Sequence, residues 1–201
     1  MDDRQPDNEK LQQWWQQSIN NDTAAFAGIH RELFDGLYNY AAKLLNDEAL
    51  ADDAVQDLFI KIWSRRASIG ILEKVKPFFY TVLRRQILNQ LRDLKLKQLK
   101  ISLVTEPDIE FSQEEILIKK EADAWLKCKI VELLNALPER QREVIYLFYF
   151  ENMSLTQIAE VMGINHQSAM NLKQRAVIKM RAANLLSVFL LFCSIYQQGK
   201  I

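Results

Sequence analysis

The chain has 201 residues, of which 49% are hydrophobic, with 5 glycines and 4 prolines, and this composition is typical of a mostly helical globular protein of one or two small domains. Its 26 basic and 26 acidic residues cancel, so bulk attraction to nucleic acid cannot be assumed and only the distribution of charge can support it. Cys128 and Cys193 lie far apart without a partner motif, which argues against a disulfide or a metal site and favours buried thiols in a reducing cytoplasm.

Residues 1–22 form a polar N-terminal extension. The opening MDDRQPDNEK is acidic and lacks the apolar core of a signal peptide. Trp14 and Trp15 stand out as the large apolar side chains of this extension. We predict a frayed start followed by a short helix whose tryptophans dock on the next domain.

Two amphipathic helices are predicted next. From Thr23 to about Asn46 apolar residues recur every three or four positions, and Asn46-Asp47 ends the pattern. A second helix, from about Glu48 to Arg66, buries one apolar stripe and exposes an acidic ledge of Asp53, Gln56 and Asp57. A plain solvated helix face with acids near a helix N-terminus would look the same.

A loop over 64–76 and a basic helix come next. Turn residues and lost periodicity indicate the loop, and Pro77 can start the helix that follows. The polar side of this helix is basic, because the sequence between residues 84 and 100 contains six basic residues and one acid, Asp93. A cationic track beside aromatic residues suits unstacked single-stranded DNA, although most of the aromatics are expected in the core.

Residues 98–112 are irregular and acidic, which predicts an interdomain linker; a plain solvated tether fits equally well. A helix over 113–136 then opens the second domain. At the other end of the chain, the tail 182–201 contains LLSVFLLFCSIY, which is too short for a membrane span. We expect the tail to extend the last helix and pack on the protein or a partner, with peripheral membrane contact as the alternative.

Between these segments, Leu137 to Arg181 predicts three helices, the last two joined as a helix-turn-helix. Pro138 suits a first helical position, and Ser154 with Gln157 has the form of a capping box. Gly163 suits a left-handed helix end, and Asn165 is a good N-cap for the third helix. An ordinary helical bundle packs in the same way, so this pattern alone does not establish DNA binding.

Two motifs of this chain resemble a known family. Leu137–Arg181, with its QREV, S-x-x-x-IAE and RA elements, is similar to region four of bacterial sigma factors of the extracytoplasmic-function type, in a form close to Bacteroidetes members. Leu50 to Trp63, LADDAVQDLFIKIW, resembles region two of the same family. The resemblance implies an all-α protein with a region 2 domain at 23–97 and a region 4 domain at 113–181.

The resemblance also implies roles for individual residues. The acidic ledge would dock on the β′ clamp helices of core RNA polymerase. The positions that match the minus-ten-binding surface are Arg65, Arg66, Arg84, Arg85, Asn89 and Arg92. The positions that match the minus-thirty-five-binding surface are Ser168, Met170, Asn171, Gln174, Arg175 and Lys179.

Three departures from the family pattern bear on promoter preference. Arg84-Arg85 replaces an arginine-asparagine pair and Asn89 an aspartate. Lys173 stands where the family carries an inward apolar residue, and Leu172 where it often carries an outward basic one. A slight rotation of the recognition helix would explain this last exchange.

The implied partners are core RNA polymerase, including its β subunit, promoter DNA and an anti-sigma factor. No glycine-rich phosphate loop, metal-ligand cluster or nucleophile-base pair occurs, and His30 and His166 are too scattered for a hydrolase. We therefore expect no enzyme activity, cofactor, metal or small-molecule substrate. The rival functions are a free-standing repressor or activator that uses only the second domain, and a membrane-surface protein centred on the tail.

Overall fold

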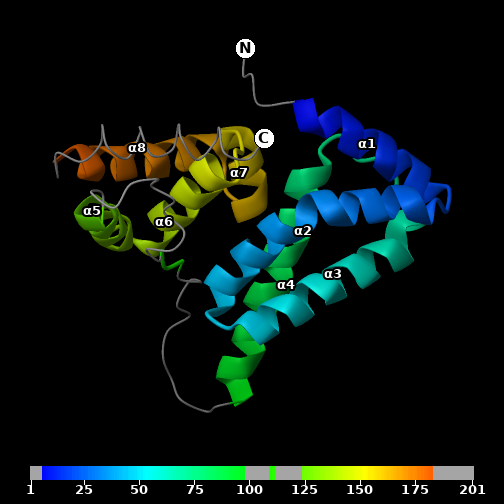
Figure 1. Ribbon diagram of the computed structural model, residues 1–201, viewed down its shortest axis with the longest axis horizontal. Coiled ribbons are helices and arrows are strands. Elements are labelled where there is room, and N and C mark those ends of the chain that lie inside the picture. The colour runs from blue at the N-terminus through cyan, green and yellow to red at the C-terminus, as the bar shows by residue number, and fades with distance from the viewer. Residues whose placement is uncertain (1–5, 98–108, 112–123, 183–201) are drawn as a thin grey trace. The chain divides into compact units, whose positions relative to one another are not determined.

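The computed structural model describes residues 6–97, 109–111 and 124–182, and the regular elements found there are all helical (Figure 1). The predicted tail and most of the predicted linker therefore lie outside the described residues. In chain order the helices are α1 (Pro6–Ile19), α2 (Thr23–Leu45), α3 (Glu48–Ile69), α4 (Val75–Lys97), α5 (Ala124–Asn135), α6 (Glu139–Ile145), the π-helix η2 (Tyr146–Phe150), α7 (Leu155–Met162) and α8 (His166–Ala182).

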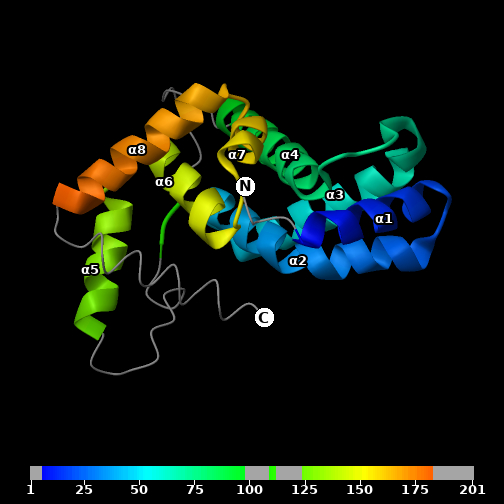
Figure 2. The same ribbon diagram turned by 90° about the horizontal axis from the view of Figure 1, so that it is seen from above.

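The chain divides into two compact units, of which the first contains α1 to α4. In this unit α2 packs against α1, α3 and α4 (Figure 2). Its core is rich in aromatic rings: Phe79 contacts Trp15 edge-on at 6.3 Å and Phe59 at 5.5 Å between ring centroids. Phe79 and Tyr80 are fully buried, so they belong to the core, as expected for most of the aromatics in this helix.

The helix boundaries of the first unit follow from local chemistry. Asp22 caps α2 by accepting hydrogen bonds from the Ala24 and Ala25 N–H groups at 2.9 and 3.0 Å. Asn46 adopts the left-handed conformation, with φ 52°, and ends α2. Asp47 then caps α3 by accepting from the Leu50 N–H at 3.0 Å. The break predicted at Asn46-Asp47 is confirmed.

The loop predicted over 64–76 is shorter than expected, because α3 continues to Ile69 and α4 begins at Val75. Arg65 and Arg66 therefore lie on a helix. The last turn of α3 buries few side chains, so its sequence lacks the apolar periodicity of a helix. The Arg66 guanidinium nevertheless stacks 3.8 Å from the centroid of the Trp63 ring. Gly70, with φ 74°, ends the helix.

The second unit contains α5, α6, η2, most of α7, and α8. Helix α8 packs against α6 (Figure 1). The predicted capping box is present: the Gln157 side chain accepts from the Ser154 N–H at 2.9 Å, and the Ser154 hydroxyl accepts from the Gln157 N–H at 3.3 Å. Gly163 has φ 64°, and Asn165 caps α8 by accepting from the Ser168 N–H at 2.7 Å.

The π-helical segment Tyr146–Phe150 was not predicted. The Glu151 N–H donates to the Tyr146 carbonyl at 3.2 Å, one residue further than in an α-helix. The wider turn lets four of the five residues be buried, Tyr146, Leu147, Phe148 and Phe150, which a regular amphipathic stripe would not allow.

Residues 109–111, which fall in the predicted linker, pack on the second unit. Ile109 and Phe111 are 0% and 3% exposed. The Asn135 amide holds the Phe111 backbone twice, accepting from its N–H at 2.9 Å and donating to its carbonyl at 3.0 Å. This part of the predicted linker is therefore anchored and is no solvated tether.

Candidate functional surfaces

The acidic ledge lies on the solvent face of α3. Asp53, Gln56 and Asp57 are exposed, while Val55 and Leu58 are buried on the opposite face. Gln56 donates to Asp52 at 2.8 Å, and Lys61 pairs with Asp57 at 3.3 Å. Exposed pairs of this kind contribute little to stability, so a partner's groups can replace them at low cost.

An exposed isoleucine adjoins the ledge and was not recognised in the sequence. Ile60 is 65% exposed and lies one helical turn beyond Gln56 and Asp57. A large apolar side chain within a polar rim is the usual composition of a binding hot spot. Ile60 lies outside the apolar spacing of Ala51, Val55, Leu58 and Ile62, and this departure is the signal by which the sequence could have identified it.

Three of the predicted minus-ten residues form one stripe on α4. Arg85, Asn89 and Arg92 are exposed and follow the spacing i, i+4, i+7. The same helix turns Arg84 inward, where it is 9% exposed. Burial leaves Arg84 little surface for DNA, and its minus-ten role stays a prediction.

The other two predicted minus-ten residues lie at the end of α3. Arg65 is exposed, whereas Arg66 is half-buried on Trp63 and donates to the Asn21 side chain. Arg66 thus has a structural role in addition to the predicted one. Lys100, one of the six basic residues counted between residues 84 and 100, lies outside the described residues.

On α8 five of the six predicted minus-thirty-five residues are exposed, while Ala169, Ala176 and Met180 are fully buried on the other face. The exposed residues are Met170, Asn171, Gln174, Arg175 and Lys179. Ser168 is half-buried and its backbone belongs to the helix cap. Ile178, 56% exposed, shares the exposed face and was missed.

The structure places the Lys173 side chain against the Phe148 ring. Its ammonium lies 3.4 Å from the centroid of the Phe148 ring, and the side chain is half-buried. The apolar stem packs inward while the cation rests on the ring face. Lys173 is therefore directed inward, and the rotation of the recognition helix stays a prediction.

Within the described residues no group of three or more acids, histidines or cysteines could hold a metal ion. None of the helices in the same parts of the chain is long and apolar enough to cross a membrane.

Comparison with known proteins identifies the two regions. Residues 29–96 match the family model described as Sigma-70 region 2, and residues 129–180 match Sigma-70, region 4. RNA polymerase sigma factor SigV of Bacillus subtilis is 31% identical over 144 residues, covering 72% of this chain and 81% of SigV. ECF RNA polymerase sigma factor SigL of Mycobacterium tuberculosis is 27% identical over 151 residues, covering 73% and 83%.

Solved structures show the same fold at low identity. CnrH in complex with the cytosolic domain of CnrY has a TM-score of 0.56 at 20% identity and covers 87% of this chain and 96% of that chain. The sigma factor RpoE in complex with the anti-sigma factor NepR from Bartonella quintana has a TM-score of 0.54 at 20% identity, with 78% and 94% covered.

Proposed function

This chain belongs to the sigma-70 family of RNA polymerase sigma factors, in its extracytoplasmic-function group, and we propose that one of its exposed polar faces binds the polymerase while the others bind promoter DNA. The chain is a sigma factor that binds core RNA polymerase and directs it to promoter DNA. The ledge Asp53, Gln56 and Asp57 docks on the polymerase, and a ledge of carboxylates suits a basic partner helix. The observation that carries this proposal is that the exposed polar faces of α3, α4 and α8 all lie within the two regions that match the family models.

DNA contacts are divided between the two domains. Arg85, Asn89 and Arg92, with Arg65 and Arg66, contact the displaced strand of the minus-ten element. The exposed face of α8 enters the major groove of the minus-thirty-five element, where amide and guanidinium groups can read base edges. Each contact is weak alone, and the polymerase joins them by holding both domains on one promoter.

We assign residues 23–97 to the first functional domain, 98–112 to the linker and 113–181 to the second. Helix α1, from the extension 1–22, is attached to the first domain, and residues 109–111 are attached to the second. The tail 182–201 has no assigned role. The chain itself makes and breaks no covalent bond, because the polymerase carries out catalysis.

We further propose control by an anti-sigma factor. Two structural neighbours, CnrH and RpoE, were solved in complexes, the latter with a named anti-sigma factor, NepR. An inhibitor that covers the α3 ledge would block polymerase binding directly. The site of action is the cytoplasm, where the polymerase and the chromosome meet.

Run-off transcription tests the polymerase assignment. Core RNA polymerase with the full-length protein should give new transcripts from DNA upstream of the protein's own gene. The double variant Asp53→Ala/Gln56→Ala should lose them while keeping its circular dichroism spectrum. Asp35→Ala, an exposed acid on α2, is the matched control and should behave like the parent. Tight duplex binding by the protein alone, without polymerase-dependent initiation, would instead indicate a repressor or activator.

The minus-thirty-five assignment is tested by Arg175→Ala. We expect a loss of about 1–3 kcal/mol in promoter binding by the holoenzyme, because a base-reading arginine contributes roughly that amount. Arg181→Ala, an exposed arginine at the end of α8, is the control. Equal effects of the two variants in competition between matched and scrambled promoters would contradict the assignment.

A further inference from the structure

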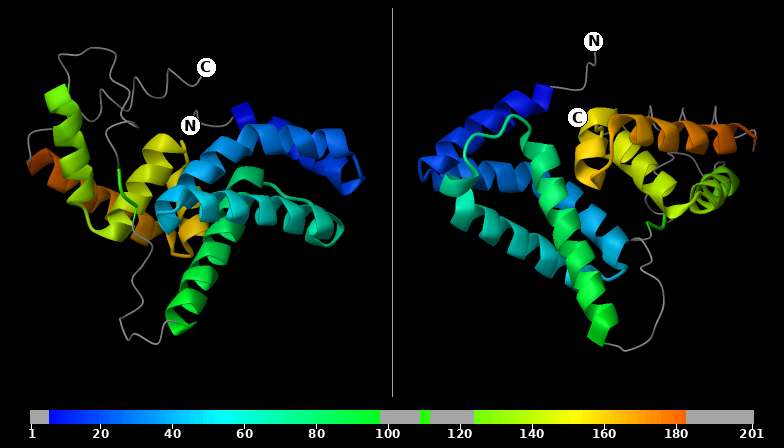
Figure 3. Two further views of the ribbon diagram at one scale, coloured as in Figure 1. Left: turned by 60° about the horizontal axis from the view of Figure 1, so that its bottom comes forward. Right: turned by 180° about the vertical axis from the view of Figure 1, so that it is seen from behind.

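Helix α8 carries an exposed apolar residue that its own domain does not cover. Ile178 is 56% exposed, whereas Ala176 and Met180, two residues before it and two after it, are fully buried. Two residues correspond to about 200° around an α-helix, so Ile178 faces away from the side of α8 that packs on the domain. Figure 3 shows α6, which contacts α8, running beside it. The opposite side of α8 presents Ile178 to solvent.

The sequence continues this exposed side of α8 as a heptad pattern. Residues 183–201 lie outside the described residues, so their sequence alone bears on their role. Counted from Ile178, apolar residues recur at alternating intervals of four and three positions, which is the spacing of a coiled-coil seam. We call these six positions the tail seam: Ile178, Ala182, Leu185, Phe189, Phe192 and Tyr196.

The side of α8 that packs on the domain has a different continuation. The positions three, seven and fourteen residues beyond Met180 are Ala183, Ser187 and Ser194. These small or polar side chains have little apolar surface to bury against the domain. In a helix that continues past residue 182, the large apolar side chains of the tail seam would therefore lie on the side that the domain leaves uncovered. An apolar surface of that length needs a partner to exclude water from it.

The composition of the tail favours a second copy of this chain as that partner. Residues 182–199 include no charged side chain. A helix that lies on a membrane surface ordinarily carries lysines or arginines on its polar face, and a charged partner protein would find no complementary charge here. A regular heptad seam, by contrast, is complementary to itself, because a two-fold axis brings the same surface of two copies together.

We propose that residues 183–196 continue α8 and form a self-association helix, in which the tail seam packs against the tail seam of a second copy of this chain. The seam begins after Arg175, so the polar residues of the predicted DNA-contacting face lie outside the pairing region. This inference does not depend on the polymerase-binding and promoter-binding roles proposed above.

Sedimentation velocity of the full-length protein tests the proposal. The tail seam is shorter than three heptads and buries a small area, so we expect a weak association with a dissociation constant of about 1–100 µM. The weight-average mass should rise from the 23.5 kDa of the monomer towards twice that value as the protein concentration increases across this range.

Two double variants separate the tail seam from the general hydrophobicity of the tail. Phe189→Ser/Phe192→Ser removes two large seam residues and should weaken the association about tenfold or more, because their apolar surface is no longer buried. Leu190→Ser/Leu191→Ser removes comparable apolar surface at two neighbouring positions that lie outside the heptad spacing. This second variant is the matched control and should associate like the parent.

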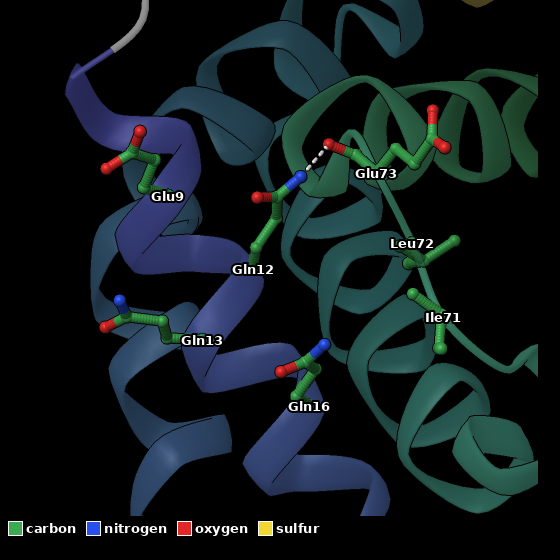
Figure 4. A pocket seen from close by; sticks show the side chains of 7 residues that line it. All are labelled: Glu9, Gln12, Gln13, Gln16, Ile71, Leu72 and Glu73. Atoms are coloured by element: carbon green, nitrogen blue, oxygen red, sulfur yellow. Dashed lines mark hydrogen bonds between the residues drawn. The ribbon is translucent and has the colours of Figure 1, made fainter.

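Ile178→Asp tests the end of the tail seam that the structure describes. A carboxylate in an apolar seam must be buried without a partner, so we expect the association to weaken about tenfold or more. Ile71→Asp is the control, because Ile71 is 77% exposed on the loop that follows α3 in the first unit (Figure 4). Both variants change exposed side chains and should keep the circular dichroism spectrum of the parent.

Three results would overturn the proposal. The first is a parent protein that keeps the mass of the monomer over the whole concentration range. The second is equal weakening by the two serine double variants, which would show that the association does not use the tail seam. The third is binding of the parent to vesicles of phosphatidylglycerol and phosphatidylcholine without self-association in their absence, which would indicate a membrane surface as the partner.

Discussion

At the scale of single residues, Lys173 shows how packing accommodates a side chain that departs from the family pattern. A lysine at an inward position suggested a rotated helix, because sequence patterns treat lysine as a surface residue. The structure places the ammonium over the Phe148 ring. Phe148 reaches this position from the π-helical segment, which no local pattern predicts, so the sequence alone could not have resolved the question.

We predict that Lys173→Ala lowers the free energy of unfolding of the second domain by about 0.5–2 kcal/mol, since both the stem packing and the cation–ring contact are lost. Lys173→Leu keeps apolar packing and should cost less. Urea denaturation followed by circular dichroism measures both. If the alanine variant unfolds at the parent's urea midpoint, the contact has no stabilising role.

Ile60 is a second single residue that leads to a prediction, in this case about binding to core polymerase. It is 65% exposed beside the polymerase-binding ledge, so replacing it should change binding and leave the fold intact. We expect Ile60→Ser to weaken core polymerase binding about tenfold or more, because a central apolar anchor typically contributes at least about 1–2 kcal/mol.

Fluorescence anisotropy of labelled protein titrated with core polymerase, in the absence of DNA, measures this change. Ile178→Ser is the control, because Ile178 is similarly exposed but lies on α8. Equal affinities for the parent and Ile60→Ser would remove Ile60 from the interface.

At the scale of elements, the features that were predictable are those encoded locally. The capping box of Ser154 and Gln157 and the cap at Asn165 each lie within four residues of sequence, and both were predicted. The true end of α3 at Ile69 was not predicted, because the last turn buries little and its sequence lacks apolar periodicity. The docking of Trp15 was predicted, but its indole N–H donates to the Gly70 carbonyl, 55 positions away in the sequence, and neither segment indicates that partner.

The docking of α1 on α2 depends on a close approach. A Cβ at Gly28 would lie 2.9 Å from the Trp14 ring, which real contacts do not tolerate. Gly→Ala inside a helix ordinarily stabilises by about 1 kcal/mol, so the sign of the change separates the two effects. We predict that Gly28→Ala destabilises the first domain by about 1–3 kcal/mol through overpacking.

Thermal denaturation of Gly28→Ala, Trp14→Ala and Gly28→Ala/Trp14→Ala tests this prediction. The double variant should lose less stability than the sum of the two single changes, because removing the indole relieves the clash. A raised melting temperature in Gly28→Ala would show that α1 can shift away from α2 at no cost.

At the scale of the whole molecule, the two units have separate cores and should unfold separately. Phe111 belongs to the second core, where it is 3% exposed and its ring contacts Phe150 at 5.3 Å. We predict that Phe111→Ala costs the second domain about 3–5 kcal/mol, the usual range for a buried phenylalanine. Scanning calorimetry should show one transition lowered and the other unchanged; two lowered transitions would contradict the independence of the cores.

The division into two helical domains was predictable because each domain carries its own periodic patterns and its own family motif. The attachment of residues 109–111 was not, since an acidic stretch around Pro107 resembles a free tether. Its two buried side chains were too few to form a recognisable pattern. Only the folded second domain supplies the surface that they fill.

The two hydrogen bonds between the Asn135 amide and the Phe111 backbone attach residue 111 to the second domain. An extended chain advances no more than about 3.6 Å per residue, so every anchored residue shortens the longest promoter spacer that the two domains can bridge. We therefore expect Asn135, through its hydrogen bonds to Phe111, to limit which distances between the two promoter elements are acceptable. Loosening it would broaden spacer-length tolerance while leaving the sequence preference at each element unchanged.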